Sequence, residues 1–238
     1  MPSCAADYGF AVATDIAPQP IGSPEDVAYW FFRLNGCLTI RNFVVHPERR
    51  GSQLTDADLL AVRFQWRSEQ NLIDHWLFDE ANQPRLFLVE VKTGGACRLN
   101  GPWTDKSGGN LTRLLEAIGC FHPDEVSQAA EALHRVGRYG GGTIEALLVA
   151  IASRRSDELA QVAASAIQLT WDEILNFIFN RFRAFRAKKA HHPQWDSQGR
   201  SLYKMAQGAR NNFDAFGESV EGVFFGRTES GLPLRQSL

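Results

Sequence analysis

Leu86-Phe87-Leu88-Val89-Glu90-Val91-Lys92 has the pattern of a central β-strand. Its apolar residues fall on both faces, as in strands that are covered from both sides of a sheet. Because side chains alternate across a strand, Glu90 and Lys92 share one face at its end. A buried carboxylate and a buried ammonium group are unfavourable unless they are paired or bind a metal. This segment therefore predicts a central strand that carries functional charges at its end.

A second acid is expected to approach Glu90. The segment from Asp58 to Trp66 predicts another strand, with Asp58 at its start. If the two strands are antiparallel, the start of one lies beside the end of the other, and Asp58 and Glu90 converge. Two carboxylates ~4 Å apart repel by roughly 4 kcal/mol at an effective dielectric constant near 20, and a divalent cation reverses that repulsion. Asp56 shares the predicted face and is a rival, but Asp58 adjoins the apolar run and is preferred.

The types of residue in this cluster predict its chemistry. Carboxylate oxygens suit Mg²⁺, which keeps several waters and also binds substrate phosphates. For Lys92 to act as a base, its pKa would have to fall by about 3 units, at a cost of ~4 kcal/mol. We therefore expect a charged Lys92 that orients the attacking water and stabilises the transition state. The metal would lower the pKa of that water.

Capping residues and apolar periodicity predict the other elements. Their order is helix, three strands, two helices, strand and helix, with a short strand before that helix and another helix after it. This order indicates an α/β fold: a mixed α+β sheet with helices on both faces. Trp76–Phe78 predicts a short apolar element between two strands, and Gly140–Gly142 a flexible join. The predicted segments are a helix over 24–34, strands over 37–45, 58–66 and 86–92, a helix over 110–118 capped by Asn110, a helix over 123–136, strands over 144–151 and 168–169, and helices over 171–182 and 201–216.

These elements divide the chain into three parts. Residues 1–22 contain Pro18 and Pro20 and predict an irregular lead-in. Residues 23–169 form the predicted core, which carries the acid cluster. Residues 170–238 form a predicted C-terminal helical extension that packs on the core.

The combination of Asp58, within Thr55–Val62, with Glu90-Val91-Lys92 resembles the PD-(D/E)xK superfamily, the restriction-endonuclease-like nucleases. The resemblance covers mainly residues 23–119, where the helix–strand–strand–strand–helix order supports it. It implies a restriction-endonuclease-like core and hydrolysis of phosphodiester bonds with Mg²⁺ or Mn²⁺. The chain departs from the family pattern at Ala57, where a proline often precedes the first acid.

The same resemblance implies additional metal ligands. The backbone carbonyl of Val91 would join Asp58 and Glu90 in the metal shell. Many members carry another acid on the first helix, and Glu25 or Asp26 could fill that place. Both are explained equally well as acids at a helix N-terminus. Of the two, Glu25 is the expected outer ligand.

A basic segment between Arg181 and Arg210 contains only one acid, Asp196. It is explained either as a solvated helix face or as a patch that contacts phosphates. Trp195 follows the basic helix and either touches the substrate or packs against the last helix. The expected nucleic-acid-binding residues are Arg183, Arg186, Lys188, Lys189 and Trp195.

Composition and charge limit the function further. The 238 residues carry a net charge of −2, which argues against an overall polyanion binder. The longest apolar runs are far shorter than the ~20 residues of a membrane helix, and the start lacks the pattern of a signal peptide. Four scattered cysteines without a CxxC pair indicate reduced thiols and no zinc ribbon. We therefore expect a cytoplasmic protein without a membrane partner.

The sequence thus predicts a Mg²⁺-dependent nuclease, an endonuclease that acts on DNA more readily than on RNA. The alternative is an inactive protein of the same fold that binds nucleic acid or assembles a complex. In that case an unusually apolar helix would serve a partner, through Phe177, Ile178, Phe179, Phe182 and Phe185. A homodimer and a partner in a multi-subunit system both stay open. Restriction, repair, mobile-element processing and phage defence all use such chemistry.

Overall fold

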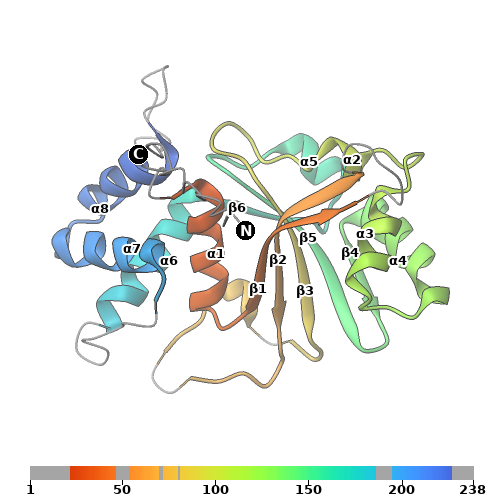
Figure 1. The fold of residues 1–238 in the computed structure, drawn as a ribbon, viewed down its shortest axis with the longest axis horizontal. Helices are drawn as coiled ribbons and strands as arrows, with labels where there is room; N and C mark the ends of the chain where they lie inside the picture. Colours follow the sequence, from red (N-terminus) through yellow and green to blue (C-terminus); the bar gives the residue numbers. More distant parts are fainter. Residues whose placement is uncertain (1–21, 47–53, 70–71, 80, 186–194, 227–238) are drawn as a thin grey trace, which may run out of the picture.

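A six-stranded mixed sheet forms the centre of the fold (Figure 1). The computed structural model describes residues 22–46, 54–69, 72–79, 81–185 and 195–226. The strand order is β1-β2-β3-β5-β4, and β6 also pairs with β5. The strands are β1 (Leu38–Val45), β2 (Thr55–Arg63), β3 (Arg85–Val91), β4 (Arg138–Gly141), β5 (Ile144–Ala152) and β6 (Ile167–Thr170). The predicted mixed α/β class is confirmed.

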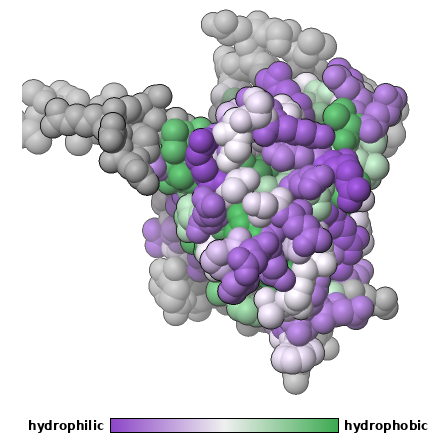
Figure 2. Space-filling view, turned by 90° about the vertical axis from the view of Figure 1, so that its right-hand side faces the viewer, coloured by the Kyte–Doolittle hydropathy of each residue, from purple (hydrophilic) through white to green (hydrophobic). Residues whose placement is uncertain are grey.

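Helices cover both faces of this sheet (Figure 1). One layer consists of α1 (Pro24–Leu34), α6 (Trp171–Phe185), α7 (Ser197–Gly208) and α8 (Phe213–Val220). The other consists of α2 (Gly101–Thr104), α3 (Asn110–Ile118), α4 (Pro123–Val136) and α5 (Asp157–Val162). Figure 2 looks onto the α3 and α4 side, where hydrophilic side chains predominate. In the ranges given above, no helix is long and apolar enough to cross a bilayer.

The central strands are buried on both faces because their apolar residues alternate. Phe87 and Val89 pack in the cluster that contains α1 and α6, whereas Leu86 and Leu88 pack with α3 and α4. β2 and β3 are antiparallel, as predicted, and β3 and β5 are parallel. This arrangement brings the ends of β3 and β5 to one edge of the sheet.

β5 carries different partners along its second edge. Its first half pairs antiparallel with β4, and its second half pairs parallel with β6. Gly140 and Gly141 belong to β4, so the prediction of a flexible join was wrong there. A short edge strand tolerates glycine because few side chains need to pack on it.

Three other boundaries differ from the predictions. β2 begins at Thr55 and ends at Arg63, so Asp58 lies inside the strand and not at its start. Gly109, with φ 62°, caps α3, and Asn110 is the first residue of that helix. The single predicted last helix is two helices, because Arg210 adopts φ 54° between α7 and α8. The predicted lead-in falls almost wholly on residues 1–21, outside the described part.

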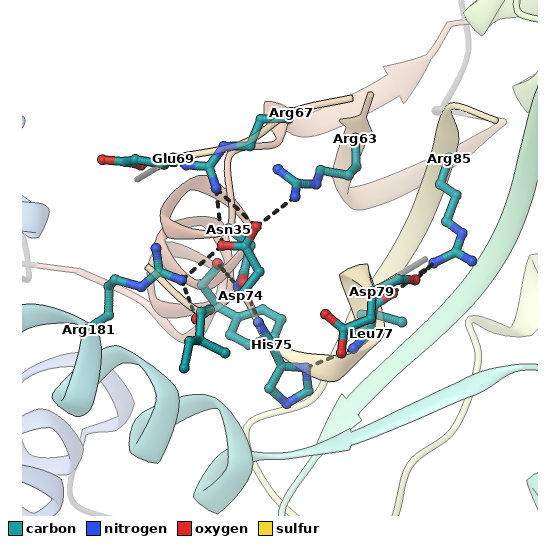
Figure 3. Close-up of polar contacts among 12 residues, drawn as sticks. Asn35, Arg63, Arg67, Glu69, Asp74, His75, Leu77, Asp79, Arg85 and Arg181 are labelled. Carbon is teal, nitrogen blue, oxygen red and sulfur yellow. Dashed lines mark hydrogen bonds and ion pairs between the residues drawn. The ribbon is translucent and has the colours of Figure 1, made fainter. Parts of the chain in front are cut away.

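A buried ion-pair cluster holds the connection between β2 and β3 (Figure 3). Asp74 accepts hydrogen bonds from Arg63 (2.6 Å), Arg67 (3.0 Å) and Arg181 (2.9 Å). The backbone N–H of His75 donates to the Asn35 side chain at 2.8 Å. The connection also contains a 3₁₀ turn, Trp76–Phe78, where the short apolar element was predicted. The cluster therefore ties this connection to α1, β2 and α6.

Replacing the shared acid tests this cluster. Asp74→Ala should lower the free energy of unfolding by about 3–5 kcal/mol, because it leaves buried guanidinium groups without a counter-charge. Urea denaturation measures the loss. Glu131→Ala, on the exposed side of α4, is the matched control and should change stability by no more than about 0.5 kcal/mol. Equal stability of the two variants would contradict a structural role for Asp74.

Candidate active site

Asp58, Glu90 and Lys92 meet where β2 lies beside the end of β3. The antiparallel ladder pairs Leu59 with Val89, so the next position places Asp58 opposite Glu90. The Asp58 carboxylate accepts a hydrogen bond from the Val91 backbone N–H at 2.7 Å. The predicted convergence of the two acids is therefore present, although Asp58 reaches it from inside the strand.

Asp58 occupies an interruption in the sheet. β1 and β2 pair at Arg41–Leu59 and again at Phe43–Ala57, and the pair between them, Asn42 and Asp58, is missing from the ladder. Asn42 has φ 51°, in the left-handed region. Such local breaks re-aim side chains and recur beside active sites. The break lets the Asp58 side chain turn towards the end of β3.

Burial and neighbouring charges perturb the Glu90 carboxylate. The residue is only 3% exposed. Burial raises its pKa to about 7, and the charges of Asp58 and Asp56 push in the same direction. An ion pair with Lys92 opposes this rise without cancelling it. Glu90 is therefore a carboxylate that titrates near neutral pH.

Asp58 is perturbed in the same sense. Burial is the largest cause that raises its pKa, and the charge of Glu25 adds to it. The hydrogen bond from Val91 N–H and the charge of Lys92 lower it. Two carboxylates whose pKa values are raised together, at one strand end, are typical of a functional site.

The backbone of Lys92 is fixed on both sides. Its N–H donates to the Ile151 carbonyl at 2.8 Å, and its carbonyl accepts from the Trp171 indole at 3.0 Å. The side chain is 26% exposed, whereas that of its partner Glu90 is buried. The Lys92 ammonium group therefore stands between the buried acid and solvent.

Trp171 is the residue that sequence reasoning missed. It was expected only as a core residue of its helix, and it is indeed buried at the start of α6. Its link to Lys92 depends on β6 lying beside β5, which places the first turn of α6 next to the end of β3. The capping box of Thr170 and Glu173 was the available signal for that position, and it is present.

The other acids fall into different environments. Asp26 accepts a hydrogen bond from the Ser23 N–H at 2.9 Å and forms an ion pair with Arg41, so its carboxylate stabilises the start of α1. Glu25 lies near enough for its charge to act on Asp58. Asp56 accepts from the Asn100 amide at 3.1 Å, which ties it to the segment after β3. Of the two acids on α1, Glu25 is therefore the one placed towards the cluster.

The carboxylate oxygens of Asp58 and Glu90 are ligands of the kind that a hard divalent cation such as Mg²⁺ takes. One Glu90 oxygen pairs with Lys92, and the other, Oε2, is buried without a hydrogen-bond partner. The described residues contain no cluster of three or more His, Cys, Asp or Glu side chains arranged to hold a metal ion. Mg²⁺ does not require such a cage, since it commonly uses one or two carboxylates, waters and substrate phosphates. Asp58 and Glu90 match that mode of binding.

The basic and aromatic residues expected to bind nucleic acid are not gathered here. Arg183 donates to Asn211 at 2.8 Å, and it lies roughly 18 Å along α6 from Trp171 at 1.5 Å per residue. Trp195 packs against Trp30 and Phe182 with ring centroids 5.3 Å from each. Arg186, Lys188 and Lys189 lie outside the described residues. Arg183 thus lies away from the acid cluster, and Trp195 packs in the core between α1 and α6.

Comparisons with known proteins identify no relative of this chain. No protein-family model matches the chain, and neither the curated proteins nor the solved structures contain a match. The chemistry of this site is therefore inferred from its own residues.

The raised pKa of Glu90 predicts how stability depends on pH. The ordinary value is 4.5 and the folded value about 7. Between these values the folded state binds more protons, so the free energy of unfolding falls as pH rises. Glu90→Gln should remove this loss, which amounts to at most about 3–4 kcal/mol above pH 7, and should have little effect below pH 4.5. Urea unfolding in EDTA at both pH values measures it.

Glu145 provides the matched control for that experiment. It is a second buried carboxylate, and it pairs with Arg85 and Arg138. Glu145→Gln should therefore lower stability at pH 8, opposite in sign to Glu90→Gln. A loss of stability in both variants at pH 8 would show that Glu90 is stabilised by its surroundings and would contradict the raised pKa.

Proposed function

We propose that the chain is a metal-dependent nuclease that hydrolyses phosphodiester bonds, in DNA more readily than in RNA. The observation that carries the proposal is the meeting of Asp58 and Glu90 at the end of β3, with Lys92 beside them. The buried Glu90 carboxylate and the half-buried Asp58 carboxylate both have raised pKa values, which disfavour their charged forms. A divalent cation would compensate both charges at once.

Each residue has a role in this proposal. Asp58 and Glu90 would hold Mg²⁺ or Mn²⁺, with the Val91 carbonyl in the same shell and Glu25 as an outer ligand. The bound ion would supply a nucleophile by lowering the pKa of a water molecule. The Lys92 ammonium group would orient the attacking water and stabilise the negative charge that develops on the phosphate oxygens. The Lys92 side chain is partly exposed, which would let the ammonium group reach a bound phosphate.

The order of elements supports the resemblance to the restriction-endonuclease-like nucleases. α1 precedes three antiparallel strands, and α3 and α4 then lead to β5, which is parallel to β3. We accordingly propose residues 23–169 as the nuclease core and the helices after 170 as its extension. The proposed setting is cytoplasmic.

A second candidate function follows from one observation. Both acids already have protein partners without a metal, since Asp58 accepts from Val91 and Glu90 pairs with Lys92. A non-cleaving protein that binds nucleic acid could retain such a site. The apolar helix that suggested an assembly role supports it less, because Ile178, Phe179 and Phe182 are buried in the cluster shared with α1, α7 and α8. We therefore prefer the nuclease.

Cleavage assays separate these candidates. Supercoiled plasmid, single-stranded DNA and RNA are incubated with the protein in Mg²⁺, in Mn²⁺ and in EDTA. Lys92→Ala should reduce metal-dependent cleavage by about 10²–10³-fold, because it removes a charge aimed at the transition state.

Lys204→Ala is the control, since Lys204 is an exposed cation on α7, and it should cleave at the wild-type rate. Full activity of Lys92→Ala would contradict the role of Lys92 in stabilising the transition state. Binding without cleavage by the wild-type protein in both metals would favour the second candidate.

A further inference from the structure

A cavity of about 410 Å³ lies between the sheet and the helices α2, α4 and α5. Its walls include Leu148 of β5, Leu133 of α4 and Leu159 of α5, together with Cys97 from the segment after β3. These helices belong to the layer on the right of the sheet and along its top in Figure 1. A volume of this size is typical of sites for small molecules or single groups of a larger ligand.

The cavity adjoins the candidate active site. Glu90 pairs across the parallel ladder with Ala150, and Leu148 lies two residues earlier on the same face of β5. Spacings of ~3.3 Å per residue and ~4.8 Å between strands place the Cα atoms of Glu90 and Leu148 roughly 8 Å apart. Cys97, which lines the cavity, lies 3.4 Å from the Ala150 carbonyl.

The charge around the cavity favours an anion. Arg98, Lys106 and Arg135 line it, and all three are exposed. Glu158 is the acid in the lining, and Asp105 acts on the neighbouring His134. The balance at the rim is therefore positive over apolar walls. Cations bind phosphates, and an apolar cavity receives an unstacked base.

His134 adds a polar group to the wall. Burial lowers its pKa, as does the charge of Lys106, whereas a hydrogen bond to the Trp103 backbone raises it. The ring N–H donates to the Trp103 carbonyl, so in the neutral imidazole the other ring nitrogen is an acceptor that can bond to the edge of a base.

We propose that this cavity binds one unpaired nucleotide of the strand that the active site cleaves. The inference rests on the proposed nuclease function, because the strand held in the cavity would be the one cleaved at the adjoining active site. The base would lie among the apolar walls, and its phosphates would lie against Arg98, Lys106 and Arg135. A paired base cannot enter without leaving the stack. Single-stranded DNA is therefore the preferred ligand over duplex.

The test measures binding without cleavage. A short fluorescein-labelled single-stranded DNA and its blunt duplex are titrated with the full chain in EDTA, and anisotropy gives both affinities. The wild-type protein should bind the single strand at least about tenfold more tightly than the duplex. The double variant Lys106→Ala, Arg135→Ala should bind the single strand about tenfold more weakly. The slope of its log affinity against log salt concentration should decrease by the equivalent of about two phosphate contacts.

A matched double variant on another surface controls for lost charge. Arg200→Ala, Lys204→Ala removes two exposed cations from α7 and should leave the single-strand affinity unchanged. Val162→Trp, at an exposed residue of the cavity mouth, should weaken single-strand binding without changing the salt dependence. Wild-type affinity in both cavity variants, or equal affinity for duplex, overturns the proposal.

The two proposals fail separately. If the wild-type chain binds single strands through the cavity but cleaves nothing in Mg²⁺ or Mn²⁺, the nuclease function fails and the binding site stands. If it cleaves and the cavity variants bind and cleave like wild type, the cavity proposal fails and the nuclease stands.

Discussion

The register of β2 against β3 is the constraint on which the rest of the site depends. It places Asp58 opposite Glu90, and it is held by apolar residues on both faces. A slip of one residue would turn Leu59 away from the cluster with α1 and Leu60 away from the cluster with α3. The packing of the core therefore determines where the two acids meet.

The same packing raises the free energy of ionising the two acids. Glu90 is buried because β3 is covered on both faces up to its last residues. The protein offsets this in part through Lys92, whose backbone is held by β5 and by Trp171. One Glu90 oxygen nevertheless stays without a hydrogen bond. Such a buried atom is costly in a site that does nothing, and a cation supplied with substrate would satisfy it.

Local signals in the sequence predicted much of this fold. Ser23 and Pro24 mark the start of α1, Gly119 marks the end of α3, and the apolar run of β3 indicates a central strand. The approach of Asp58 to Glu90 followed from strand direction alone. These features depend on neighbouring residues, which a sequence displays directly.

Other features depend on contacts between distant segments. Asn42 tolerates a left-handed φ, but only the pairing of β1 with β2 places that break opposite Asp58. The sequence grouped Arg181 with a basic segment, whereas in the structure it is buried and forms an ion pair with Asp74. Trp171 reaches Lys92 only because β6 lies beside β5. The cavity beside Glu90 exists because α5, a helix without a sequence prediction, closes one side of it.

The proposed nuclease requires Asp58 and Glu90 to share one divalent cation. Anomalous diffraction from a crystal grown with Mn²⁺ at pH 8 tests it most directly. The expected result is a peak between the two carboxylates, about 2.0–2.2 Å from one oxygen of each, with Lys92 turned away from Glu90. A map without that peak, in which Glu90 still pairs with Lys92, would contradict the claim.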